Sequence, residues 1–103
     1  MNFKEVGFEE FPETWTPELG DEFIGTVREI KEVTVDNKTR HLAIMEARPD
    51  GKLYTVWLNG VLRGKFNSGK VTEGTVVKIV FDGKKQSPVS KFMYNDYRLF
   101  VSE

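Results

Sequence analysis

The chain has 103 residues and no cysteine, and this absence excludes several kinds of chemistry. Without thiols there is no disulfide, no thiolate zinc site and no cysteine nucleophile. The single histidine, His41, has no second histidine with which to share a metal. We interpret it as a partly buried neutral side chain, and we expect neither a metal nor a cofactor.

Long apolar runs are also missing. No stretch approaches the roughly 20 apolar residues of a membrane-spanning helix, and the N-terminus lacks the basic and then apolar pattern of a secretory signal. We therefore expect a cytoplasmic protein. The composition, 39% hydrophobic and 30% charged, is typical of one folded domain.

The net charge of −1 hides an uneven distribution. Residues 1–22 hold one basic and seven acidic residues, a net charge of −6, whereas residues 23–103 hold 14 basic and 9 acidic residues, a net charge of +5. A basic body favours a polyanionic partner, although +5 also fits an ordinary solubilising surface. We divide the chain into an acidic and aromatic N-terminal arm, residues 1–20, and a folded body, residues 21–103.

Hydrophobic alternation and turn signals predict an all-β fold with one short helix. The helix is capped by Asn59 and runs through Val61, Leu62 and Phe66. The expected strands cover residues 22–33, 39–48, 53–58, 75–81 and 91–101. Within the first, the apolar parity shifts between Val27 and Ile30, which predicts a bulge. Three strands, a helix and two strands is the order of the five-stranded, closed oligonucleotide-binding (OB) barrel. An SH3-like barrel is the main structural alternative.

The second and third strands flank Pro49-Asp50-Gly51-Lys52, which is a hairpin signal. The pairing expected for a two- or four-residue loop is Ala47 with Tyr54, Met45 with Val56, and Ala43 with Leu58. That face is wholly apolar, so we assign it to the core, whereas a three-residue loop would invert the assignment. The opposite face is mixed and faces solvent or a partner; it carries Arg40, Leu42, Ile44, Glu46, Arg48, Leu53, Thr55 and Trp57.

Several segments resemble one family. They are Pro12-Glu13-Thr14-Trp15, Gly20-Asp21, Gly25-Thr26-Val27, Tyr54-Thr55-Val56-Trp57-Leu58, Val61-Leu62 and Gly74-Thr75-Val76-Val77-Lys78-Ile79. Together they are similar to small OB-fold proteins of bacteriophages and mobile elements, several of which bind single-stranded DNA. The resemblance spans nearly the whole chain. It implies a DNA-binding protein of DNA replication, located in the host cytoplasm if a phage encodes it.

Proteins that bind single strands combine cations along a groove with flat rings on which bases stack. OB domains usually present both on the second and third strands and on two flanking loops. Our candidate residues are Lys38 and Arg40 at the first loop, Arg48 and Trp57 on the mixed face, and Lys84, Lys85, Lys91, Phe92 and Tyr94 around the second loop. We expect phosphates along the cations and bases on the rings, with DNA as the ligand and RNA as the alternative. The structural alternatives are a Trp57 covered by the arm, and Phe92 and Tyr94 closing the barrel end.

Other functions have weaker support. Gly64 to Lys70 has the spacing of a phosphate-binding P-loop, but Val71 stands where Ser or Thr must hold magnesium, so we expect no enzyme and no catalytic residue. The second hypothesis is a protein-interaction module that docks on a replication or recombination protein through Leu42, Ile44, Leu53 and Trp57. A third, dependent idea is that the acidic arm lies across the basic groove and competes with nucleic acid.

Overall fold

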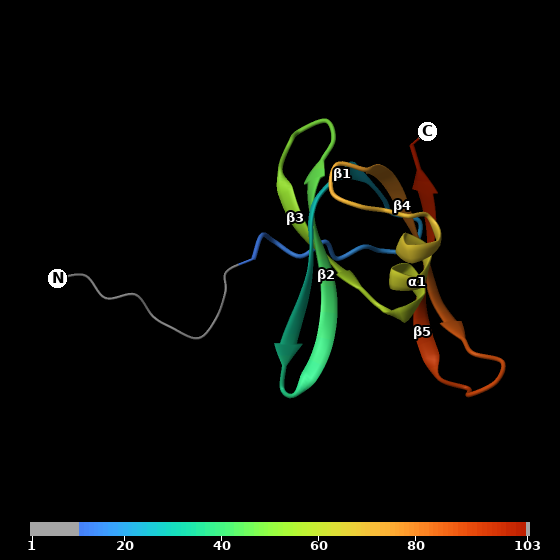
Figure 1. Cartoon of the computed structure of the whole chain (residues 1–103). Helices are drawn as coiled ribbons and strands as arrows, with labels where there is room; N and C mark the ends of the chain where they lie inside the picture. Colours follow the sequence, from blue (N-terminus) through green and yellow to red (C-terminus); the bar gives the residue numbers. More distant parts are fainter. Residues whose placement is uncertain (1–10, 103) are drawn as a thin grey trace.

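The computed structural model describes residues 11–102 of the chain (Figure 1). Within them, one antiparallel sheet has the strand order β3-β2-β1-β4-β5, and a short helix joins β3 to β4. The elements are β1 (Glu22–Val35), β2 (Lys38–Ala47), β3 (Leu53–Leu58), α1 (Gly60–Ser68), β4 (Val76–Gln86) and β5 (Met93–Val101). The mostly β fold, the element order and Asn59 as the cap of α1 are confirmed.

The long strand β1 belongs to both halves of the sheet. Gly25 pairs with Ala47 of β2 on one side and with Val77 of β4 on the other. A Cβ atom at Gly25 would lie 2.5 Å from the Glu46 carbonyl oxygen, so only glycine fits this crossing. The predicted bulge is confirmed, because the register between β1 and β2 shifts between Val27 and Glu29. These two features bend the sheet around the core.

The core lies on the concave side of the sheet, and α1 contributes Leu62 and Phe66 to it. The arm contributes Trp15, whose ring contacts Phe23 at 5.5 Å between centroids and Tyr97 at 6.3 Å. The most deeply buried side chains include Val27, Met45, Leu62, Val77 and Ile79. Trp15 is therefore a structural part of the body rather than a free arm residue.

The expected closed barrel is not formed by the described residues, because β3 and β5 are the two edges of the sheet and do not pair. The arm runs beside β3, where Trp15 donates its backbone N–H to the Thr55 carbonyl at 2.9 Å. On β5, the Asn95 carbonyl accepts from the Asn59 side chain at 2.8 Å, and the Tyr97 carbonyl accepts from Lys65. Groups outside the sheet thus form hydrogen bonds with backbone carbonyls of β3 and β5. In a closed barrel, the two edge strands would instead form hydrogen bonds with each other.

The β2–β3 hairpin has the predicted faces but a different register. The observed pairs are His41 with Leu58, Ala43 with Val56 and Met45 with Tyr54, two residues away from the expected pairing. The connection is longer than expected, since Glu46 and Leu53 form the last pair. Because side chains alternate with a period of two, a slip of two residues leaves the apolar face on the core.

The β4–β5 hairpin is longer than the sequence predicted. Strand β4 passes a bulge between Phe81 and Gly83, where Gly83 has a φ of 83°, and continues to Gln86. Lys84 and Lys85 therefore lie on a strand and not in a loop, which corrects the expectation for residues 82–90. Only residues 87–92 form the connection. Both this hairpin and the β1–β2 hairpin project from the same end of the body (Figure 1).

Candidate nucleic-acid interface

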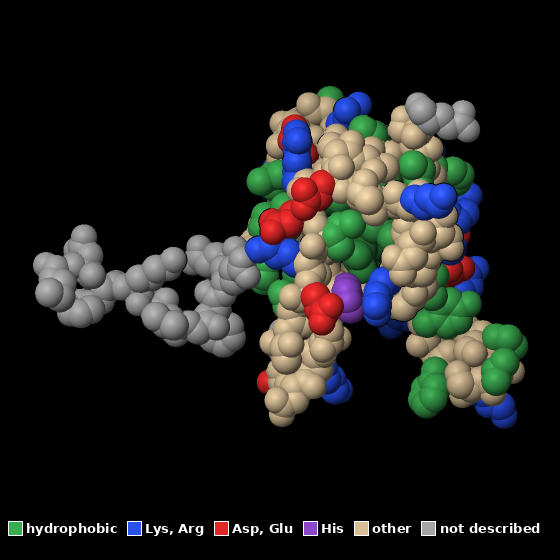
Figure 2. Space-filling model, viewed as in Figure 1, with side chains coloured by type: hydrophobic (Ala, Val, Ile, Leu, Met, Phe, Trp, Pro, Cys, Tyr) green, Lys and Arg blue, Asp and Glu red, His purple; other side chains and the backbone are tan. Residues whose placement is uncertain are grey.

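A pocket of about 410 Å³ lies where the two projecting hairpins meet the body. Figure 2 shows the hollow between the two projections, with the His41 side chain at its inner end. Residues from four elements line it: Thr39, Arg40 and His41 of β2, Trp57 and Leu58 of β3, Asn59 and Gly60 with Arg63 at the start of α1, and Asn95 and Tyr97 of β5. The bend of β1 and the position of α1 bring these elements together.

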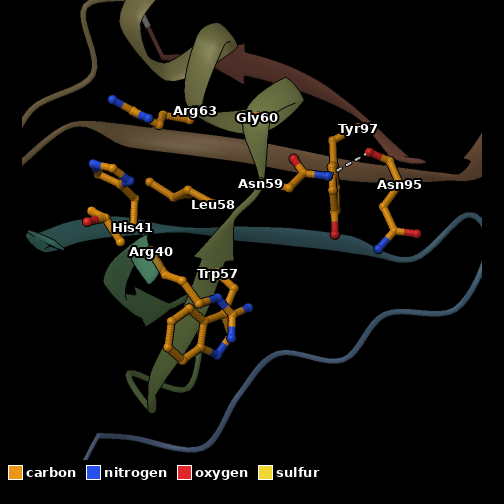
Figure 3. Close-up of a pocket in the computed structure, with 10 residues that line it drawn as sticks. Arg40, His41, Trp57, Leu58, Asn59, Gly60, Arg63, Asn95 and Tyr97 are labelled. Atoms are coloured by element: carbon orange, nitrogen blue, oxygen red, sulfur yellow. Dashed lines mark hydrogen bonds between the residues drawn. The ribbon is translucent and has the colours of Figure 1, made fainter. Parts of the chain in front are cut away.

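Trp57 and Arg40 form one stacked unit in this pocket (Figure 3). The Arg40 guanidinium carbon lies 4.2 Å from the centroid of the Trp57 ring, which is a cation–π contact. The Trp57 indole N–H donates to Thr14 Oγ1 at 3.4 Å, so the arm holds one edge of the half-buried ring. Trp57 was expected either to be covered by the arm or to be open for stacking. The arm contacts only its edge, and the ring still lines the pocket.

The cations at the pocket lack carboxylate partners among residues 11–102. Elsewhere on this part of the chain, carboxylates pair with Arg28, Lys31, Lys52, Lys65, Lys78 and Arg98, and only Arg48 and Lys70 have no such partner among the described residues. No described carboxylate pairs with Arg40 or Arg63 of the pocket, with Lys38 beside it, or with Lys84, Lys85 and Lys91 of the β4–β5 hairpin. Within residues 11–102, positive charge is therefore not neutralised by carboxylates along the hollow, where an anion can reach it.

His41 has the environment that the sequence predicted. Its side chain is mostly buried, and Nε2 lies 3.4 Å from a carboxylate oxygen of Glu32. No group of three or more His, Asp or Glu side chains within the described residues could hold a metal ion. We therefore assign His41 to the wall of the pocket.

The aromatic residues of the β4–β5 hairpin are exposed. Phe92 lies in the connection and Tyr94 on β5, paired with Lys85 of β4. Neither side chain closes an end of the fold, so that structural alternative is wrong. Lys91 lies next to Phe92 with a φ of 60°, and Lys84 pairs with Asn95, which lines the pocket. The hairpin thus continues the pocket with rings and cations.

Arg48 does not join this cluster. It follows the far end of β2, eight residues from Arg40, which separates the two positions by about 26 Å along a strand. The proposed apolar docking patch is also incomplete, because Leu42 is fully buried. Thr55 of the same face is buried too, and its hydroxyl donates to the Pro12 carbonyl at 2.7 Å. The arm covers part of the face that we expected to be open.

The sequence interpretation missed Arg63, Asn59 and Asn95 as pocket residues. Asn59 accepts from the Leu62 backbone N–H at 2.9 Å and donates to Asn95, and so ties α1 to β5 (Figure 3). A usable signal existed for Arg63. It lies four residues after the predicted cap, and residues four apart share one face of a helix.

Two further expectations concern the arm and the glycine-rich segment. Glu13 forms an ion pair with Lys52 at 2.7 Å and not with the pocket arginines, while residues 1–10, which carry three of the five glutamates of the arm, lie outside the described residues. The segment from Gly64 to Lys70 forms the end of α1 and its cap at Gly69. It is no loop that opens a helix, as phosphate binding of the P-loop type requires.

Comparison with known proteins adds no relative: no protein-family model, curated protein or solved structure matches the chain. Among the described residues, no helix has both the length and the apolar character needed to cross a bilayer. Any functional conclusion therefore rests on the fold and on the geometry of the pocket.

Proposed function

We propose that the protein binds single-stranded DNA without strong sequence preference and without catalysing a reaction. The observation that carries the proposal is the set of cations without a described carboxylate partner around a pocket that also contains the stacked Arg40–Trp57 unit. Cations and flat rings in one groove are the two requirements of single-strand binding.

Each component has a chemical role in this proposal. Phosphates bind at Arg40 and Arg63 on opposite sides of the pocket and continue along Lys38, Lys84, Lys85 and Lys91. A base stacks on the Arg40–Trp57 unit, since the planar guanidinium presents a second face on which a base can lie. Phe92 and Tyr94 offer further rings on the hairpin. Bound phosphates release counterions, so affinity falls steeply with salt.

The fold is proposed to be an open relative of the OB barrel. The strand order, the bent first strand and the helix between β3 and β4 support this. A pocket between the β1–β2 and β4–β5 hairpins is also where OB domains bind oligonucleotides. On this proposal the protein belongs with small phage and mobile-element factors that act in DNA replication, in the cytoplasm of a host and together with a replication or recombination protein.

The test is fluorescence anisotropy with a labelled single strand, a matched duplex and a matched RNA strand, at about 50 and 200 mM salt. We expect preference for the single strand and a strong loss of affinity at the higher salt. Equal weak binding to single strand and duplex, or no binding at low salt, would refute the proposal. Either of those results would direct the search toward the alternative of a protein-interaction module.

A further inference from the structure

The two hairpins beside the pocket expose different side chains at their tips. Residues 36–39 of the β1–β2 hairpin are Asp, Asn, Lys and Thr, as expected for a solvated turn. The β4–β5 hairpin instead exposes Val89, Phe92 and Met93, at 92%, 75% and 60% of their surface. Figure 2 shows hydrophobic side chains spread over the right-hand projection, whereas the left-hand projection has almost none. The exposed apolar side chains of the β4–β5 tip therefore indicate a surface that contacts a binding partner.

The apolar side chains lie on both faces of this ribbon. Met93 pairs with Gln86 and Tyr94 pairs with Lys85, and consecutive strand residues point to opposite faces. A ribbon that only supports the bases of one strand needs apolar groups on one face. Apolar groups on both faces fit an element that inserts between two surfaces.

The charge of the β4–β5 hairpin limits the kinds of partner that it can bind. From Gly83 to Asn95 the chain has three lysines and no acidic residue, and none of these lysines pairs with a described carboxylate. An apolar tip surrounded by cations suits a partner with an apolar interior and an anionic rim. The end of a nucleic-acid duplex is such a partner, because its terminal base pair is flat and apolar and two phosphate chains flank it.

Continuity with the pocket favours the duplex end over a lipid surface. Asn95 lines the pocket and lies on the same strand as Met93 and Tyr94. A strand held in the pocket therefore leads onto the hairpin. We propose that the β4–β5 hairpin inserts at the junction where the bound single strand becomes a duplex, with Val89, Phe92 and Met93 against the terminal base pair and the lysines on the two phosphate chains. This inference rests on the proposed single-strand binding.

The experiment compares a duplex carrying a single-stranded tail with a free strand of the same length as the tail. The proposal predicts that the tailed duplex binds about fivefold more tightly or more, the effect of one stacked ring. The double variant Val89→Ala/Met93→Ala, which leaves the stacking ring of Phe92 in place, should lose this advantage and keep its affinity for the free strand. Phe100→Ala is the matched control, an exposed phenylalanine on β5 outside the hairpin tip, and it should keep the advantage.

A second readout is 2-aminopurine placed in the first base pair of the tailed duplex. Its fluorescence should rise when the unaltered protein binds, because insertion unstacks the base, and should stay constant with the double variant. Circular dichroism of both variants checks that they remain folded, as expected for changes at exposed side chains.

The outcomes separate this inference from the proposed function. No binding of the free strand refutes both. Binding of the free strand with no preference for the tailed duplex refutes the junction alone. If the double variant weakens both substrates equally, the hairpin belongs to the single-strand track and the inference is wrong. Hairpin-dependent binding to phosphatidylserine vesicles, without a junction preference, would assign the tip to a lipid surface instead.

Discussion

Replacing Arg40 by lysine and by glutamine separates the two contributions that this side chain makes to the proposed binding. The guanidinium lies 4.2 Å from the centroid of Trp57 and has no described carboxylate partner. It therefore offers both a charge for a phosphate and a plane for a base. Lysine keeps the charge and loses the plane, whereas glutamine loses the charge as well.

The magnitudes follow from the geometry. An exposed cation–π contact contributes about 0.5–1 kcal/mol and a stacked base about 1–3 kcal/mol. We predict that Arg40→Lys loses about 1 kcal/mol, a fivefold weaker affinity, with an unchanged dependence on salt. Arg40→Gln should weaken binding further, and the slope of log K against log salt should become shallower by about 0.7, the value for one phosphate on a single strand.

The assay is an anisotropy titration at several salt concentrations with an oligonucleotide of about eight nucleotides, within the range of OB site sizes. Arg48→Gln is the matched control, because Arg48 also follows strand β2 and lacks a described partner but lies about 26 Å from Arg40. That distance exceeds the Debye length of about 8 Å at physiological salt, so its slope should not change. Equal losses for Arg40→Lys and Arg40→Gln, or an equal change of slope for Arg48→Gln, would refute the reasoning.

Three other substitutions test the site and the fold. Trp57→Ala should weaken single-strand binding by about 1–3 kcal/mol with the salt slope retained, and a folded variant with normal affinity would show that no base stacks there. Burial raises the pKa of Tyr97 above its ordinary value, so the native state holds this proton more tightly than the unfolded chain. The free energy of unfolding should then be unaffected by this group below pH of about 10 and fall as pH rises further; chemical denaturation across that range should show a smaller fall for Tyr97→Phe. Gly25→Ala should lower the free energy of unfolding by about 2 kcal/mol or more, because its Cβ would lie 2.5 Å from the Glu46 carbonyl oxygen; an unchanged thermal midpoint would mean that the crossing of β1 adapts easily.

Local alternation predicted the strands and their buried faces because burial follows a period of two. The β2–β3 hairpin shows how robust this information is. Its true register places Met45 opposite Tyr54 and not opposite Val56, yet each side chain remains on its predicted face. A slip of one residue would have reversed every assignment.

Closure of the sheet was not predictable in this way. Whether β3 pairs with β5 depends on which groups compete for their edges, and those groups come from distant parts of the chain. Here Trp15 of the arm occupies β3, while Asn59 and Lys65 occupy carbonyls of β5. Alternation along one strand carries no information about these partners.

The site was predictable where it follows from strand parity and missed where it depends on packing. Arg40 and Trp57 were found because they alternate outward on adjacent strands. Arg63 was missed because its place at the pocket depends on how α1 sits between β3 and β5. Arg48 lies outside the pocket, which parity could not reveal because it describes the face of a strand and not the position along it.

From the sequence, the basic charge of the body fitted either a surface that binds a polyanion or an ordinary solubilising surface. The ion pairs show which parts of the surface fit each interpretation. Six cations on the rest of the described surface, among them Lys52 and Arg98, are paired with carboxylates, whereas Arg48 and Lys70 have no described carboxylate partner. The pocket cations Arg40 and Arg63 have no carboxylate partner in the part of the chain that the structure describes. A cation without a described partner is insufficient, however, since Arg48 also has none and lies about 26 Å from Arg40 of the pocket. Single-strand binding is therefore inferred from three features found at one place: cations without a described partner, a pocket, and an accessible ring. Arg40 has all three features around it and Arg48 has only the first, so comparing their variants tests the inference most directly.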